Sequence, residues 1–173
     1  LLYLCGVIFF LYKLREVALF VSLFALGHSI TLLSGVLIGL KINPYIIDAI
    51  IGLSVAYKAL ENLDGLKSII SKIPNPKLAV FVFGLIHGLG LATKIQDMTL
   101  SDDGLVTNIL SFNLGVEIGQ MIALLGALVA INLWRTQGGF YKHARMFNYC
   151  LMFSGFMLAS FQISGYFLSF ALL

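Results

Sequence analysis

A chain of 173 residues would ordinarily form one soluble domain, but here 60% of the residues are hydrophobic, 11% are charged, and the mean hydropathy is +0.98. Soluble chains average about 45 to 50% apolar and about 25% charged residues, so this composition excludes an ordinary soluble domain. The net charge of +3 comes from basic residues in short segments between apolar runs, which excludes nucleic acid as a partner. The two cysteines lie in apolar segments without CxxC spacing, so no disulfide framework is predicted.

Six apolar runs follow one another along the chain. A bilayer core about 30 Å thick needs about 20 apolar residues, so the sequence predicts an all-α, polytopic integral membrane helical bundle of about six transmembrane helices. Residues 1–173 would form a single transmembrane domain, whose partner is the lipid bilayer. The predicted spans are residues 1–12, 17–40, 45–60, 78–93, 105–133 and 146–173.

The first run is too short to span a bilayer, and we expect it to be the end of a helix whose beginning is missing. A cleaved signal peptide is the competing interpretation. A signal peptide carries its basic residues before the apolar run, whereas Lys13 and Arg15 follow it. The truncated first helix is therefore preferred.

The longest predicted loop covers residues 64–76. Within it, the stretch LKSIISKI places four apolar residues at helical spacing, which is typical of a short helix on the membrane surface. Pro74 and Pro76 should end that helix.

Orientation follows from the lysine and arginine residues in the connections. Lys41 and Lys94 are the two basic residues of the second and fourth connections, whereas the other three connections hold eight. Cytoplasmic loops are the basic ones, so residues 64–76 should be cytoplasmic and both termini should lie outside. The last run carries no charged residue and could face lipid or form a homo-oligomer interface.

Four predicted helices each carry a polar residue at about the same depth. His28, Ser54, His87 and Glu117 lie 10 to 12 residues from the starts of their spans, or roughly 15 to 18 Å at 1.5 Å per residue. Small residues near these positions, such as the glycines four apart at 84/88 and 115/119, suggest that each polar group faces protein rather than lipid. Asn113, Glu117 and Gln120 should share one helix face.

Two imidazoles and a carboxylate in the middle of a membrane fit a binding site for a divalent transition metal. Imidazole suits nickel, cobalt, copper and zinc, and a carboxylate offsets part of the charge of the ion. The competing interpretation is a hydrogen-bonded network that only fixes helix packing. A serine and lysine pair, Ser54 and Lys58, has no third group to orient it for catalysis.

Four motifs resemble the HupE/UreJ family of membrane proteins, which are proposed nickel or cobalt permeases. They are FALGHSITLL (24–33), IGLSVAYKALENL (51–63), FGLIHGLGLA (83–92) and FNLGVEIGQ (112–120). The resemblance implies an integral protein of a bacterial inner membrane with roles for His28, Ser29, Thr31, Glu61, Asn62, His87, Asn113, Glu117 and Gln120. Family members look as though they carry an early Asp-His pair, which would precede the start of this chain.

Taken together, these patterns predict a secondary permease for nickel or cobalt. His28, His87 and Glu117 would bind the metal, while Ser29, Thr31, Asp48, Ser54, Glu61, Asn62, Asn113 and Gln120 would line the path or support the ligands. Two alternatives remain open at this stage. One is an intramembrane hydrolase in which the same groups hold a zinc cofactor, and the other is a structural or accessory membrane subunit.

Overall fold

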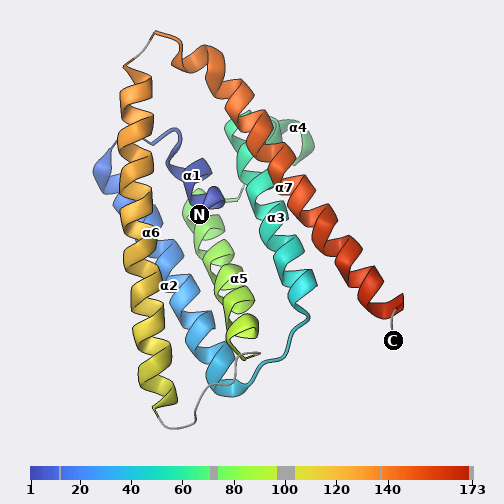
Figure 1. Ribbon diagram of the computed structural model, residues 1–173. Coiled ribbons are helices and arrows are strands. Elements are labelled where there is room, and N and C mark those ends of the chain that lie inside the picture. The colour runs from blue at the N-terminus through green and yellow to red at the C-terminus, as the bar shows by residue number, and fades with distance from the viewer. Residues whose placement is uncertain (12, 71–73, 97–103, 137, 172–173) are drawn as a thin grey trace.

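The computed structural model describes residues 1–11, 13–70, 74–96, 104–136 and 138–171, and all regular structure within them is α-helical (Figure 1). In chain order the helices are α1 (Leu2–Ile8), α2 (Leu14–Ile38), α3 (Pro44–Asn62), α4 (Leu66–Ile69), α5 (Pro76–Gln96), α6 (Leu105–Arg135) and α7 (Phe140–Ala171).

Within the described ranges, four helices are long and apolar enough to cross a membrane. These candidate spans are Leu14–Ile38, Pro76–Gln96, Val106–Arg135 and His143–Ser169. The predicted all-helical membrane protein is therefore confirmed, but the count of about six spans is not. Helix α3 has 19 residues, three of which are the charged Asp48, Lys58 and Glu61, and α1 has only seven.

Helices α3 and α5 begin in the same way, with an Asn-Pro pair. The side chain of Asn43 accepts a hydrogen bond from the backbone N–H of Tyr45 at 3.0 Å, and Asn75 does the same for Lys77 at 3.0 Å. Asparagine caps the exposed donors of a first turn, and proline is suited to the first helical position because it lacks an N–H. Pro76 thus starts α5 and does not end the preceding surface helix as predicted.

The predicted surface helix and the predicted loop after α6 are both shorter in the structure than the sequence suggested. The surface helix predicted over residues 66–73 is helical over Leu66–Ile69, and Ile70 is extended; residues 71–73 lie outside the described ranges. The loop predicted over residues 134–145 is largely helix, because α6 continues to Arg135 and α7 begins at Phe140. Charged residues near these helix ends were wrongly assigned to the loop, although a helix can extend beyond the bilayer.

Helices α2 and α5 pack backbone to backbone through glycines. A Cβ added at Gly27 would lie 2.5 Å from the carbonyl oxygen of Phe81. At Gly84 and Gly88 an added Cβ would overlap the backbone of Phe24 and His28. Thr31 reinforces the contact, because its hydroxyl donates to the carbonyl of Leu85 at 2.6 Å. The predicted role of the glycines around His87 in close helix packing is confirmed.

Helices α3 and α7 form a second close pair, side by side in Figure 1. A Cβ added at Gly52 would lie 2.7 Å from the backbone nitrogen of Ala159, and one added at Gly155 would lie 2.6 Å from that of Ala56. The small residues allow these two backbones to approach as closely as those of α2 and α5.

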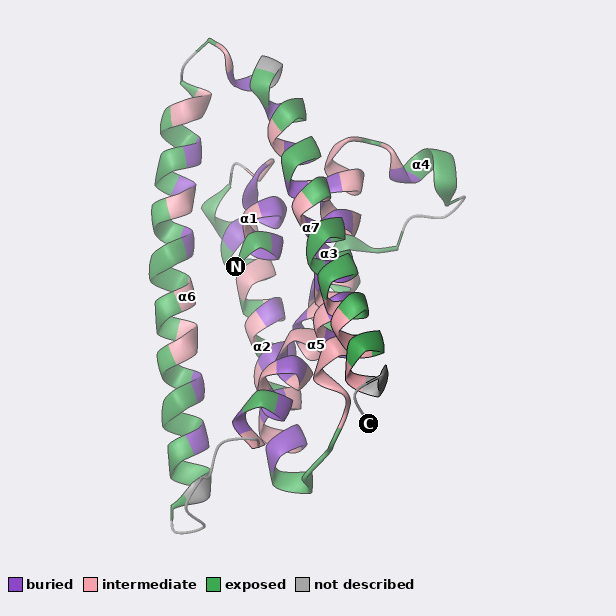
Figure 2. Ribbon diagram, turned by 45° about the vertical axis from the view of Figure 1, so that its right-hand side comes forward, coloured by how far each residue is buried: buried purple, intermediate pink, exposed green. Residues whose placement is uncertain are grey.

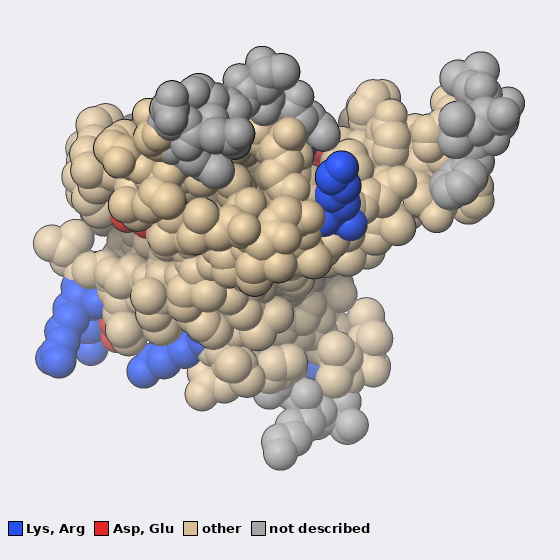
Figure 3. All heavy atoms as spheres, turned by 90° about the horizontal axis from the view of Figure 1, so that it is seen from below, with Lys and Arg blue, Asp and Glu red and all other residues tan. Residues whose placement is uncertain are grey.

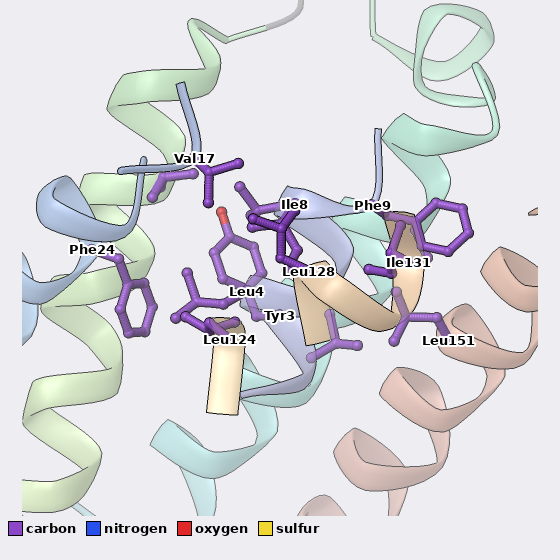
Figure 4. Close-up of a cluster of buried hydrophobic side chains, with 14 of the residues drawn as sticks. Tyr3, Leu4, Ile8, Phe9, Val17, Phe24, Leu124, Leu128, Ile131 and Leu151 are labelled. Atoms are coloured by element: carbon purple, nitrogen blue, oxygen red, sulfur yellow. The ribbon is translucent and has the colours of Figure 1, made fainter. Parts of the chain in front are cut away.

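A cluster of buried apolar side chains joins these pairs to α1 and α6. Figure 4 shows Tyr3 and Leu4 of α1 beside Phe24 of α2 and Leu124 and Leu128 of α6. The guanidinium of Arg135, at the end of α6, donates to the carbonyls of Leu11 and Phe9 after α1. The short helix α1 is thereby anchored between the longer ones.

Helix α6, like α7, is less buried than α2 and α5, and it stands beside the other helices in Figure 2. Its buried residues lie at helical spacing along one side. They are Ile109, Asn113, Leu124, Leu128 and Ile131. The predicted close packing at Gly115 and Gly119 is wrong, since nothing in the described chain lies within 4 Å of an added Cβ. Both glycines are two residues from Glu117, and residues two apart do not share a helix face.

Candidate functional site

Both membrane histidines line one cavity, which we call the imidazole cavity. Its volume is about 300 Å³, and it lies between α2, α3, α5 and α6. Its wall is made by His28, Asp48, Ile51, His87, Gly90, Leu91, Lys94, Val116 and Gln120. Imidazoles from α2 and α5 meet here because Gly88 brings the α5 backbone against the carbonyl of His28.

The imidazole of His87 is held by its own helix. Its Nδ1 lies 2.7 Å from the carbonyl oxygen of Phe83, one turn earlier. A carbonyl oxygen only accepts hydrogen bonds, so Nδ1 carries a proton, and in the neutral ring the lone pair is on Nε2. A hydrogen bond of this kind also orients the ring, as it does for many histidines that bind metals.

The imidazole of His28 is 3% exposed, and its Nδ1 has no hydrogen-bond partner among the described residues. The Phe24 ring contacts both imidazoles, with centroid separations of 6.3 Å to His28 and 5.0 Å to His87. A buried polar atom without a partner costs free energy, especially where water is scarce. His28 thus brings an unpaired polar nitrogen to the wall of the cavity, although the atom itself is enclosed by protein.

Glu117 lies in a second cluster, formed with Ser29 and Asn113. The Oε1 atom of Glu117 accepts a short hydrogen bond from the hydroxyl of Ser29 and another, of 3.2 Å, from the amide of Asn113. The same amide also donates to Ser29 Oγ at 3.0 Å. These bonds join α6 to α2. Because Asn113 and Glu117 both lie on the buried side of α6, their predicted common face is confirmed.

Glu117 does not line the imidazole cavity. With Ser29 it lines a neighbouring groove of about 360 Å³, and Gln120 lines both spaces. Within the described ranges, no three His, Cys, Asp or Glu side chains lie close enough together to hold a metal ion. The ligand set of His28, His87 and Glu117 therefore stays a prediction.

Thr31 and Ser54 are occupied by backbone contacts. Besides its bond to Leu85, Thr31 lies 3.1 Å from the carbonyl of Gly27. Ser54 is 1% exposed and donates to the carbonyl of Ile51 in its own helix at 2.7 Å. Neither residue belongs to the wall of the imidazole cavity. Their predicted place on the path has no support from these contacts.

Glu61 and Asn62 lie elsewhere, at the opposite end of α3 from Asp48. Glu61 forms a 2.8 Å ion pair with Lys58. The amide of Asn62 donates to the carbonyl of Gly6 and to Oδ1 of Asn148, both at 2.9 Å. Asn62 also lines a cavity of about 470 Å³ between the ends of α3 and α7. The structure thus separates these two predicted path residues from the histidines.

Two residues of the site were not predicted from the sequence. Lys94, which was assigned to a loop, lies in α5 and forms an ion pair with Asp48, with Nζ 2.8 Å from Oδ2. Gln162 of α7 donates to the same carboxylate oxygen at 3.4 Å. The spacing of seven residues between His87 and Lys94 was a usable signal, since residues seven apart share a helix face.

Among the described residues, few charged side chains are visible at the end of the molecule near Asp48. Figure 3 views the molecule from the end at which α2 and α5 finish and α3 begins, and most of the described surface in this view is uncharged. The predicted placement of this end on the side of the membrane opposite the cytoplasm is not tested by the fold.

The comparisons with known proteins agree with the resemblance found in the sequence. A family model described as HupE / UreJ protein matches residues 1–170. Neither the comparison with curated proteins nor the comparison with solved structures found a match. Since the family match covers nearly the whole chain, this integral membrane protein belongs to the HupE/UreJ family.

Proposed function

We propose that this chain is a secondary membrane permease that carries a divalent transition metal, nickel or cobalt, as its substrate. The HupE/UreJ family is associated with nickel and cobalt uptake, which supports this choice of substrate. His28, His87 and Glu117 bind the ion, and Ser29, Asn113 and Gln120 support the ligands or line its path.

The observation that carries the proposal is the pair of imidazoles in one cavity. His87 uses Nδ1 to bond a carbonyl and keeps the lone pair on Nε2, while Nδ1 of His28 is buried without a partner in the described chain. Two imidazoles from different helices that line one cavity form a site that suits nickel or cobalt. A network that served only for packing would be expected to satisfy both rings.

Glu117 supplies the negative charge that a dication needs in the membrane. Its carboxylate is one turn from Gln120, which faces both the imidazole cavity and the groove beside Glu117. Glu117 and the imidazoles line neighbouring spaces, and a movement of α6 relative to the tightly packed α2 and α5 would bring them together. Alternating access by relative movement of helices is the usual behaviour of secondary transporters.

A zinc hydrolase is less well supported. A catalytic zinc is held by three preorganised protein ligands, and no such trio lies together in the described chain. A transported ion is bound and released, so ligands that assemble only in part of the cycle fit a permease better.

Equilibrium binding of Ni²⁺ and Co²⁺ to the purified protein tests the proposal. We expect about one bound ion per chain and at least about a tenfold weaker affinity in His28→Ala, His87→Ala and Glu117→Gln. Ser34→Ala is the matched control, because the Ser34 hydroxyl is on α2 and bonds only its own helix at 2.6 Å. Unchanged binding in all three variants would refute the proposed ligands.

A further inference from the structure

The imidazole cavity extends along one face of α5 from His87 to an ion pair. His87, Gly90, Leu91 and Lys94 all line it, at the spacing of one helix face. Lys94 lies seven residues after His87, which is about 10 Å along the helix axis at 1.5 Å per residue. Asp48, near the start of α3, completes the wall at that end.

Lys94 and Asp48 make close contacts across two helices. The ammonium lies 2.8 Å from Oδ2 and 3.1 Å from Oδ1 of Asp48. The Asp48 side chain is 16% exposed, and that of Lys94 is 52% exposed. A mostly buried carboxylate is thus paired with a cation on a flexible, half-exposed stem.

The carboxylate of Asp48 lies close to α5 and has a second hydrogen-bond donor. An added Cβ at Gly90 would lie 3.0 Å from Ile51, 3.1 Å from Ile47 and 3.6 Å from Asp48 Oδ1, so α3 and α5 are close beside it. The Gln162 amide also reaches Oδ2. Without the ammonium of Lys94, the carboxylate would keep the hydrogen bond from Gln162 and its place in the cavity wall.

Local helix geometry does not explain this pair. The pairs Lys13 with Glu16, Lys58 with Glu61, and Lys67 with Asp64 each join residues three apart in one segment. Such pairs form easily wherever the helix surface brings opposite charges together. Asp48 and Lys94 are 46 residues apart and meet at one end of the imidazole cavity.

We propose that Lys94 is a specificity-determining residue that occupies the Asp48 carboxylate until a divalent cation displaces it. This inference rests on the proposed function, because it concerns the ion that then reaches the histidines. The ammonium of Lys94 is tethered beside the carboxylate, so its binding is intramolecular and it competes with monovalent ions from solution. A dication is attracted to the carboxylate about twice as strongly as a monovalent ion at the same distance.

Binding measurements on the full chain test the proposal. Lys94→Met keeps a long apolar stem but frees Asp48, so Ni²⁺ should bind roughly two- to fivefold more tightly, and added Na⁺ should weaken this binding more than in the wild type. Asp48→Asn should bind Ni²⁺ more weakly, and adding Lys94→Met to it should have no further effect. Lys94→Arg should behave as the wild type. Lys67→Met is the matched control, since its 2.7 Å pair with Asp64 is exposed.

The outcomes separate the two proposals. If the wild type binds metal but Lys94→Met binds no more tightly, or if its effect persists in Asp48→Asn, the role of Lys94 is refuted and the permease is not. If the wild type binds neither Ni²⁺ nor Co²⁺, the proposed function fails and the role of Lys94 fails with it. If thermal unfolding shows that Lys94→Met is unstable, Ni²⁺ binding is measured with Lys94→Gln instead, which also lacks the ammonium.

Discussion

Gly88 is the residue on which the closest approach of α2 and α5 depends. A Cβ there would overlap both the carbonyl of His28 and the hydroxyl of Thr31. The carbonyl of His28 is part of the α2 backbone, so it cannot move away without separating the helices. The same contact brings His28 and His87 to one cavity.

Gly88→Ala should therefore destabilise the protein, by about 1 to 3 kcal/mol from overpacking, and should also weaken metal binding. Thermal unfolding in detergent measures the first effect. Gly119→Ala is the control, because nothing in the described chain lies within 4 Å of its added Cβ. Alanine favours a helix by about 1 kcal/mol over glycine, so the control should be neutral or more stable. Equal effects at both glycines would contradict this packing.

At Glu117, hydrogen bonding and charge can be separated. Glu117→Gln keeps an oxygen that accepts from Ser29 and Asn113, whereas Glu117→Ala removes the partner of both. We expect the glutamine variant to unfold near the wild-type temperature and yet lose metal affinity. The alanine variant should also lose stability, by about 1 to 2 kcal/mol. Wild-type metal affinity in the glutamine variant would show that the carboxylate only joins helices.

At the scale of elements, α3 and α7 are linked by a polar contact as well as by glycines. Asn148 is 0% exposed; its Oδ1 accepts from Asn62, and its Nδ2 donates to the carbonyl of Ala144 at 2.9 Å. Asn62 in turn reaches the carbonyl of Gly6. This short chain of bonds connects α7 to α3 and α3 to α1.

A double-mutant cycle with Asn62→Ala and Asn148→Ala should give a coupling energy of about 0.6 kcal/mol, the average for hydrogen bonds between helices in membranes. Chemical or thermal unfolding supplies the four stabilities. Asn62→Ala with Ser154→Ala is the control cycle, since Ser154 is on the same helix but bonds the carbonyl of Cys150. Additive effects in the asparagine cycle would show that this contact does not join the elements.

The existence of the helices could be predicted from apolar runs, but their limits could not. Proline was treated as a terminator at Pro76, although Asn75 before it forms a cap that starts α5. Charged residues were treated as loop at Lys94 and Arg135, although both lie inside helices. Hydrophobicity reports where a chain contacts lipid, whereas caps and helix packing decide where it stops being helical.

The members of the site could be predicted in part. Depth along each span selected His28 and His87, which line one cavity, and it also selected Ser54, which bonds its own helix. Counting residues gives a level in the membrane and not a direction around the helix. The partner of Asp48 depends on how α3 and α5 cross, which no local pattern reveals.

At the scale of the whole molecule, two tight helix pairs stand beside a less buried α6. Glycines lock α2 to α5 and α3 to α7, whereas α6 meets α2 through the cluster of Ser29, Asn113 and Glu117. This division gives the molecule rigid parts and one helix whose displacement would alter the site.

The orientation predicted from basic residues can be checked by labelling in intact cells. With Cys5 and Cys150 replaced by serine, Lys41→Cys should react with a maleimide that does not cross membranes. Lys67→Cys should react only after the cells are permeabilised, because residues 64–76 should be cytoplasmic. The reverse pattern would contradict both termini being outside.

The central claim, that this fold carries a divalent transition metal through the His28 and His87 site, is tested most directly by transport into proteoliposomes. The purified chain is reconstituted with a metal-sensitive dye inside, and Ni²⁺ or Co²⁺ is added outside. We predict saturable entry for the wild type, and loss of entry in His28→Gln with His87→Gln while the fold, checked by thermal unfolding, is kept. Wild-type entry by the folded double variant, or no entry by the wild type, would contradict the account.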